Sequence, residues 1–222
     1  MPLQPVTLAE SVFKDIKEAI VLGRIAPGSK ISEPELARVY GISRGPLREA
    51  IGRLEACGLV DRKANIGARV VSLSGAQLVE IYLVREALEG MAARLAAEAM
   101  TDDEIQALRA VLTRHARDIE EDTKHAYFQQ EGDLDFHFRI IQGSHNARLA
   151  ALLCDDLYQL VRLYRHRSGM RSQRGPRALR EHEHILDAIA DRQPEMAEQL
   201  MRAHIRASRQ NIERLLSTGE ED

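Results

Sequence analysis

Residues 32–51 read SEPELARVYGISRGPLREAI. Ser32 and Glu35 have the spacing of a capping box, which predicts a short helix over 34–40. Gly41 is expected to end that helix in a left-handed conformation, and a second helical pattern begins two residues later. Two short helices joined by a tight glycine turn are typical of a helix-turn-helix.

The flanking sequence completes a small domain around these two helices. Ser43 is expected to cap the second helix, which runs to about residue 56. The other expected elements are a helix over 8–22 and two β-type runs, over 59–62 and 68–73. This order predicts a winged helix-turn-helix with a small β wing.

The N-terminus of the second helix is slim and basic. Backbone N–H groups at a helix N-terminus bind phosphate, and arginines there reach guanine edges in the major groove. Between residues 38 and 69 there are 7 Lys+Arg against 3 Asp+Glu. The candidate DNA-binding residues are Arg38, Ser43, Arg44, Gly45, Pro46, Arg48, Arg53, Asn65 and Gly67.

Two alternatives to these DNA contacts stay open. In the first, the arginines only solvate the surface of a small helical domain and contact no DNA. Arg53, two turns into its helix, would pair with Glu49 at i−4 instead.

The chain beyond a linker near residues 72–76 reads as helix throughout. Capping boxes begin at Ser74 and at Thr101. The expected helices span 77–99, 102–121, 125–143, 146–168, 176–191 and 194–217. We therefore predict a mainly α protein. Its expected parts are a DNA-binding domain over 1–73, an all-α antiparallel bundle of about six helices over 74–218, and a disordered tail over 219–222.

Four polar residues face the expected interior of this bundle. Asp133 and His137 are at i and i+4 on one helix, so their side chains point the same way. His182 and His204 each lie on the apolar stripe of a helix. A divalent ion would satisfy all four groups at once, and facing helices are where bundles build metal sites. The alternative is that each histidine bonds a carbonyl or a carboxylate in the core, and spacing alone leaves both interpretations open.

Composition limits the classes of protein that fit. Hydrophobic residues are 44% and charged residues 29% of the 222, which argues against disorder throughout. We find no apolar run near the roughly 18–20 residues that span a membrane, and no signal peptide. The 2 cysteines give no disulfide framework, so we expect a cytoplasmic protein.

The charge is unevenly distributed along the chain. The net formal charge is −3, but residues 1–75 carry +3 and residues 76–222 carry −6. Such asymmetry indicates two modules with different partners, the first of which is expected to be a nucleic acid.

Several segments of the first module carry a family resemblance. The stretches LGRIAPG (22–28), ELA (35–37), GISRGPLREAI (41–51) and LEACGLV (54–60) resemble the winged helix of GntR-type transcriptional regulators. The resemblance covers nearly all of residues 8–73. One departure is Gly45, where the family often has Thr, so a phosphate-bonding hydroxyl is lost.

The second module resembles the FCD ligand-binding domain of FadR-subfamily GntR regulators. The segments that carry this resemblance are YLVREALE (82–89), DLDFH (133–137), SHN (144–146), EHEHILDAI (181–189) and MRAHI (201–205). In metal-containing members an Asp and three His hold a divalent ion, and the matching positions are Asp133, His137, His182 and His204. Zn²⁺, Ni²⁺ and Mn²⁺ all suit this set. Six helices rather than seven point to the VanR-like subgroup.

The resemblance also implies a small carboxylate effector that completes the metal shell. Arginine binds carboxylates in a bidentate manner, so the candidate effector-binding residues are Arg85, Tyr82, Asn146 and Arg162. The alternative for Arg85 is a structural bridge to Glu89 at i+4. Apolar residues over 78–95 and 152–164 exceed what one core face needs. Some are expected to be plain core and some to form a dimer interface, since regulators of this type are usually homodimers.

The sequence thus predicts a transcriptional regulator rather than an enzyme. It would bind an inverted repeat in double-stranded DNA as a homodimer, with its operator affinity controlled by a small organic acid at a metal site. Whether that acid releases or promotes DNA binding is open. The alternative is a metal-dependent hydrolase or isomerase with an accessory nucleic-acid-binding domain. No HExxH-like pairing, nucleophile elbow or phosphate loop supports that alternative.

Overall fold

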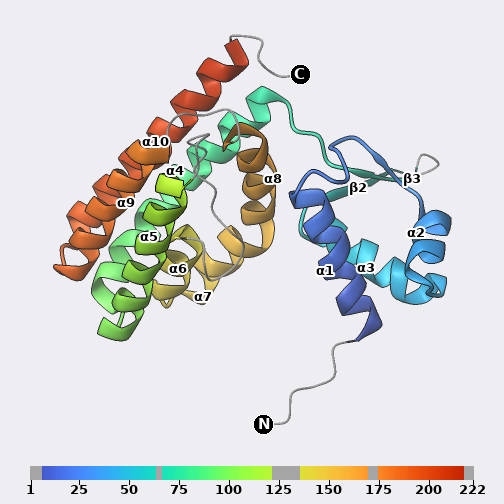
Figure 1. Ribbon diagram of the computed structural model, residues 1–222, viewed down its shortest axis with the longest axis horizontal. Helices are drawn as coiled ribbons and strands as arrows, with labels where there is room; N and C mark the ends of the chain where they lie inside the picture. Colours follow the sequence, from blue (N-terminus) through green and yellow to red (C-terminus); the bar gives the residue numbers. More distant parts are fainter. Residues whose placement is uncertain (1–6, 64–66, 122–135, 170–174, 218–222) are drawn as a thin grey trace. The chain divides into compact units, whose positions relative to one another are not determined.

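The computed structural model of the chain describes residues 7–63, 67–121, 136–169 and 175–217 (Figure 1). Backbone contacts divide the chain into two compact units. The first comprises Met1–Ser72 and Asp156–His166, and the second comprises Leu73–Asp155 and Arg167–Asp222. Among the described residues the structure is mainly helical with one small sheet, which confirms the predicted fold class.

The first unit has the element order of a winged helix-turn-helix. Its elements are α1 (Leu8–Val21), β1 (Lys30–Ile31), α2 (Glu33–Tyr40), α3 (Arg44–Ala56), β2 (Val60–Lys63) and β3 (Gly67–Val70). The strands form an antiparallel sheet in the order β1-β3-β2, with Lys30 opposite Arg69 and Val60 opposite Val70. The sequence does not predict β1, because two residues are too few to show an alternating pattern.

The core of this unit lies between α1 and α3, which pack against each other (Figure 1). Apolar residues at helical spacing on both helices meet there and exclude water. The large ones are at most 2% exposed: Val12, Ile16, Ile20, Leu47, Ile51 and Leu54. This packing fixes α3 and leaves its N-terminal end at the surface.

Two serines begin helices without capping them through their side chains. Ser32 and Ser43 occupy the N-cap positions of α2 and α3, yet among the described residues neither side chain makes a capping hydrogen bond. The capping box expected from Ser32 is therefore wrong. A proline stands at N2 of α2 (Pro34) and at N3 of α3 (Pro46), and each removes one of the two N–H groups that a capping hydroxyl binds. Gly41 does end α2 in the left-handed region, with φ of 62°, as predicted.

The second module is built from long helices. Its elements are α4 (Gly75–Ala99), α5 (Asp102–Glu121), α6 (Phe136–Gly143), α7 (Ala147–Ala150), a π-helical segment (Ala151–Leu157), α8 (Tyr158–Gly169), α9 (Gly175–Ala190) and α10 (Pro194–Ser217). Counted with α7, the π-helical segment and α8 as one stretch, the described residues hold the six helices expected. Residues 158–166 of α8 group with the first unit.

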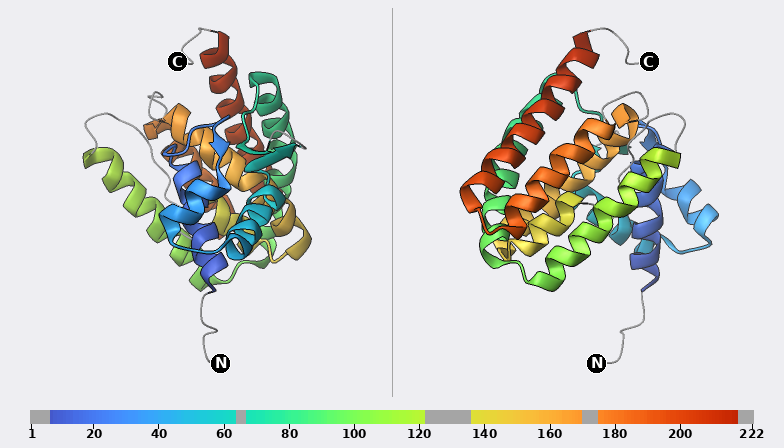
Figure 2. Two further views of the ribbon diagram at one scale, coloured as in Figure 1. Left: turned by 90° about the vertical axis from the view of Figure 1, so that its right-hand side faces the viewer. Right: turned by 60° about the vertical axis from the view of Figure 1, so that its left-hand side comes forward.

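Helices α4, α9 and α10 form the centre of the second unit. Helix α10 packs along α4, while α9 packs against α10, α5 and α4. Figure 2 shows α9 and α10 antiparallel beside each other, joined by a short turn. Helix α6 packs against α4 and α5, so side chains from α4, α6, α9 and α10 can meet inside this unit.

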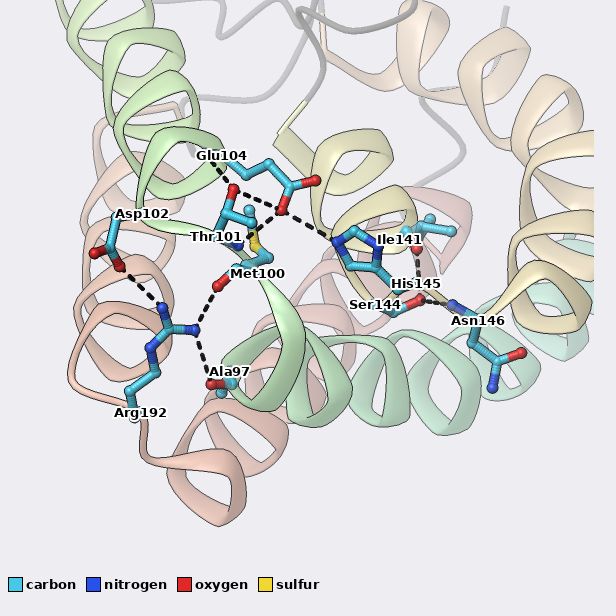
Figure 3. Close-up of polar contacts among 10 residues, drawn as sticks. All are labelled: Ala97, Met100, Thr101, Asp102, Glu104, Ile141, Ser144, His145, Asn146 and Arg192. Atoms are coloured by element: carbon cyan, nitrogen blue, oxygen red, sulfur yellow. Dashed lines mark hydrogen bonds and ion pairs between the residues drawn. The ribbon is translucent and has the colours of Figure 1, made fainter.

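A polar cluster ties the ends of several helices together (Figure 3). Arg192, between α9 and α10, donates to the carbonyl oxygen of Met100 at 2.6 Å, at the C-terminal end of α4. Thr101 and Glu104 form the predicted capping box of α5, since the Thr101 N–H donates to Glu104 at 2.8 Å. The same carboxylate contacts His145 Nε2 at 3.1 Å, just beyond α6. These contacts fix the relative positions of α4, α5 and α6.

Two further observations concern the predicted setting. None of the helices in the described part of the chain is both long and apolar enough to cross a membrane. Cys57 and Cys154 are both free thiols.

Candidate functional site

The second unit brings together three histidines from three helices. His137 is the second residue of α6, His182 lies on the apolar face of α9, and His204 lies on that of α10. Their exposed fractions are 1%, 0% and 4%. One ligand nitrogen from each ring lies within 4.8 Å of the other two. Neutral imidazoles are rarely gathered in a core, so this convergence needs a chemical explanation.

The spacing of one pair of these nitrogens fits a shared divalent ion. His182 Nε2 and His204 Nε2 are 3.2 Å apart. Ligand nitrogens lie about 2.0–2.1 Å from such an ion. If the nitrogen–metal–nitrogen angle is between a right angle and the tetrahedral angle, the two nitrogens are about 2.9–3.4 Å apart. The ring of Phe136 stacks on His182 at 4.2 Å between centroids and closes one side of the cluster. Three buried imidazoles are a donor set that Zn²⁺ or Ni²⁺ accepts.

Two glutamates contact the histidines at their other ring nitrogens. Glu89 Oε2 lies 2.5 Å from His137 Nδ1, and Glu181 Oε2 lies 2.8 Å from His204 Nδ1. Metal-binding histidines commonly donate their second N–H to such a carboxylate. Neither glutamate is predicted from the sequence to contact a histidine. An acidic residue directly before His182, and one at i+4 from Arg85, are the available signals.

Arg85 and Tyr82 extend this arrangement along α4. Arg85 is 3% exposed, and its Nε donates to Glu89 Oε1 at 2.6 Å, so the expected bridge at i+4 is present. The guanidinium lies over the Tyr82 ring, 4.6 Å from its centroid. Its Nη1 is buried and has no hydrogen-bond partner among the residues that the structure describes. A buried donor of this kind suits an anionic ligand.

The other residues predicted for this module differ in position. Asp133 lies outside the described residues. Asn146 is exposed, and its side chain caps α7 by accepting from the Leu149 N–H at 3.1 Å. Arg162 is buried in the part of α8 that groups with the first unit. His184 is exposed, as expected from its position two residues after His182.

The first unit presents the start of α3 at its surface. Ser43, Arg44, Gly45 and Arg48 are exposed, and a Cβ atom added at Gly45 would meet nothing within 4 Å. Because the Ser43 side chain makes no capping bond, its hydroxyl is available to a ligand at the helix N-terminus. The remaining candidates divide by position: Arg38 and Gly67 are exposed, Pro46 is half-buried, and Asn65 lies outside the described residues.

Two of the candidate arginines are held by carboxylates. Arg48 Nε lies 3.1 Å from Glu33 Oε2, in a pair where the arginine side chain is 66% exposed. Arg53 pairs with Glu10 of α1 rather than with Glu49, and it stacks over the Phe13 ring at 4.1 Å. The Arg53 hydrogen bond is the largest cause that lowers the pKa of the Glu10 carboxyl. Arg53 therefore ties α3 to α1.

A winged helix with an exposed, basic helix N-terminus, together with a helical module that holds a buried histidine cluster, is typical of two-module DNA-binding regulators. The comparisons with known proteins agree. Residues 8–70 match the model of bacterial regulatory proteins of the gntR family, and residues 80–207 match that of the FCD domain. The chain belongs to the GntR family of transcriptional regulators, and it combines that family's DNA-binding domain with an FCD effector-binding domain.

Relatives with this organisation extend over nearly the whole chain. The HTH-type transcriptional regulator YdhC of Bacillus subtilis is 30% identical over 95% of this chain and 93% of its own length. The Nta operon transcriptional regulator of Aminobacter aminovorans is 34% identical over 81% of this chain and 82% of its own length. The HTH-type transcriptional repressor RspR of Escherichia coli is 28% identical over 96% of this chain and 92% of its own length.

Solved structures share the fold. McbR/YncC of E. coli matches with a TM-score of 0.72 at 20% identity, over 95% of this chain and 99% of that one. A GntR-type regulator from Rhodococcus sp. RHA1 matches with a TM-score of 0.70 at 24% identity, over 92% of this chain and 96% of that one. The family and the relatives favour a regulator over the alternative of a metal-dependent hydrolase or isomerase. Membership of the VanR-like subgroup stays a prediction.

Proposed function

We propose that a small organic acid, bound at a divalent metal ion in the helical module, controls the affinity of this regulator for its operator. His137, His182 and His204 hold the ion, with Asp133 as the fourth ligand expected from the sequence. The ion is Zn²⁺, Ni²⁺ or Mn²⁺. When bound, it supplies open positions that accept effector oxygens.

The observation that carries this proposal is the convergence of three buried imidazoles. Their nitrogens lie within 4.8 Å of one another, in a core where unpaired polar groups are costly. A metal ion accounts for the three rings together, whereas separate core hydrogen bonds would not require them to face one another.

The carboxylate class of the effector rests on Arg85. Its Nε donates to Glu89, and its guanidinium lies over the Tyr82 ring. The buried Nη1 is then the atom that would bind an anion. A planar guanidinium binds a carboxylate through two parallel hydrogen bonds. Arg162 and Asn146 stay weaker candidates. The side chain of Asn146 already caps α7.

The operator is read by the start of α3. Ser43 and the backbone there contact phosphate, while Arg44 and Arg48 reach base edges and Gly45 and Pro46 leave room for the duplex. The exposed residues Arg38 and Gly67, together with Asn65, contact the adjacent backbone. Arg53 serves by holding α3 against α1.

We further propose that the regulator is a homodimer on an inverted repeat, as two-fold operators require. Val84 and Met91, seven residues apart on α4, are 47% and 41% exposed and supply an apolar face for this contact. The domains are proposed to span 1–73 and 74–218, close to the division of the two units and of the two family matches. The setting is the cytoplasm, where the DNA is and where both thiols stay reduced.

Elemental analysis of the purified chain tests the metal site. We expect about one ion per chain in the wild type and its loss in His137→Ala and His182→Ala, because each removes a ligand. His184→Ala is the matched control, an exposed histidine on the same helix as His182. Unchanged metal content in both ligand variants would remove the site. A thermal-unfolding screen of small organic acids on the metal-loaded chain then identifies the effector class.

A further inference from the structure

Two arginine–glutamate–histidine chains of contacts lead into the histidine cluster. On α4, Arg85 contacts Glu89 four residues later, and Glu89 contacts His137. Each glutamate oxygen has its own partner: Oε1 accepts from Arg85 Nε at 2.6 Å, while Oε2 lies 2.5 Å from His137 Nδ1.

The same arrangement recurs on α9. Arg177 Nε lies 3.0 Å from Glu181 Oε1, again at i and i+4, and Glu181 Oε2 lies 2.8 Å from His204 Nδ1. Both chains therefore end on the Nδ1 atom of a histidine whose ring is buried. One repeat would be a local ion pair, but two that converge on one cluster from different helices indicate a common role.

The chemistry of the contact fixes the form of each ring. A carboxylate only accepts hydrogen bonds, so a neutral imidazole whose Nδ1 contacts one carries its proton on that Nδ1. The lone pair is then on Nε2, which is the atom available to a metal. His204 Nε2 does point at a second ring, 3.2 Å from His182 Nε2.

We propose that Glu89 and Glu181 are positioning residues. Each glutamate is oriented by its arginine and holds its histidine in the Nδ1–H tautomer. His137 and His204 then present unprotonated Nε2 atoms to a metal ion, even in the metal-free chain. This inference rests on the proposed metal site, but the tautomers exist in the metal-free chain.

The two chains differ in burial, which ranks their effects. The side chains of Arg85 and Glu89 are 3% and 4% exposed, whereas those of Arg177 and Glu181 are 68% and 22% exposed. Charges act more strongly away from water, and exposed pairs are screened by solvent and salt. The Glu89 chain therefore has the larger influence on the cluster.

The test measures tautomers and metal affinity separately. Ring ¹⁵N chemical shifts of the metal-free wild type are expected to show Nδ1–H at both His137 and His204. Zn²⁺ affinity is measured by competition with a chromophoric chelator. Arg85→Met/Glu89→Leu removes the buried chain without leaving one charge unpaired. We expect it to mix the His137 tautomers and to weaken Zn²⁺ binding by about 10–100-fold.

Further variants separate positioning from simple packing. Glu89→Gln keeps an acceptor oxygen, so its Zn²⁺ affinity should be intermediate. Glu181→Leu should weaken Zn²⁺ binding less than the α4 double variant does. Glu183→Leu, at an exposed glutamate on the same helix, should match the wild type.

The outcomes are distinct. Nε2–H tautomers at His137 and His204 in the metal-free wild type would overturn the inference, as would Zn²⁺ affinities within twofold of wild type in both Leu-bearing variants. A larger loss from Glu181→Leu than from the α4 double variant would contradict the ranking. A wild type that binds no Zn²⁺, Ni²⁺ or Mn²⁺ would remove the proposed function, while the ring shifts would still decide the tautomers.

Discussion

Ser43 and Arg44 lie at the helix end that is proposed to contact DNA. Pro46 removes the N–H that would have occupied the Ser43 hydroxyl, and Gly45 adds no side chain beside it. The N-terminus of α3 therefore presents backbone N–H groups, a hydroxyl that makes no capping bond and an exposed arginine.

Substitution of Arg44 tests this residue directly. Arg44→Ala should cost about 1–3 kcal/mol of binding at a cognate operator, because a bidentate contact to guanine is lost. Fluorescence anisotropy with a selected inverted repeat measures this loss of binding free energy. Arg114→Ala, an exposed arginine on α5, makes the same change of charge and should bind nearly as wild type does. Equal affinity of Arg44→Ala and wild type would show that α3 is not the recognition helix.

Residue-level prediction from the sequence succeeds where a residue breaks a pattern. A histidine on an apolar stripe stands out, and all three described histidines of the predicted set do meet. Glu89 and Glu181 do not stand out, because a glutamate on a helix usually faces solvent. Only the packing of α4 against α6, and of α9 against α10, gives these carboxylates their histidine partners.

Elements follow the sequence closely where local chemistry decides their ends. The capping boxes at Ser74 and Thr101 form as predicted, and the helices after them begin within two residues of the expected positions. The capping box at Ser32 does not form, although the N–H of Glu35 at N3 is present. Strand β1 exists only because β3 lies beside it, so its formation depends on tertiary pairing.

The start of α5 carries a prediction about pH. The backbone N–H of Thr101 is the main cause that holds the pKa of the Glu104 carboxyl below its ordinary value of 4.5, and the contact with His145 adds to it. A carboxyl with a depressed folded pKa stabilises the fold above its unfolded pKa and loses that contribution as the pH falls through the folded pKa.

Glu104→Gln should therefore lower the free energy of unfolding at pH 7 by about 0.3–1 kcal/mol. Near pH 3 the difference from wild type should shrink towards zero. Urea unfolding at both pH values measures this. Asp103→Asn removes an equal charge from the same helical turn and should show a smaller change. A Glu104→Gln deficit that stays constant from pH 7 to pH 3 would contradict the assignment.

At the scale of the whole molecule, the chain separates DNA contact from ligand contact. The uneven charge anticipates this, since the N-terminal 75 residues carry +3 and the rest −6. Composition and periodicity predict the two modules and their helices. They do not predict that part of α8 groups with the first unit, because that grouping depends on long-range packing.

The proposed dimerisation belongs to the scale of the whole molecule. Val84→Glu/Met91→Glu should convert the chain to a monomer in sedimentation equilibrium and weaken operator binding on the order of 10²-fold, because the second half-site no longer adds avidity. Met196→Glu, at an exposed apolar residue of α10, is the matched control. A stable dimer of the α4 double variant would place the interface elsewhere.

The most direct test of ligand control is the affinity of the full-length, metal-loaded chain for its selected inverted repeat. It is measured with and without the organic acid that raises the unfolding temperature most. A coupling of about 1–3 kcal/mol predicts a change in Kd of roughly 5–150-fold, and His182→Ala should abolish the change. An acid that stabilises the fold through the histidine cluster yet leaves the Kd for DNA unaltered would contradict the account.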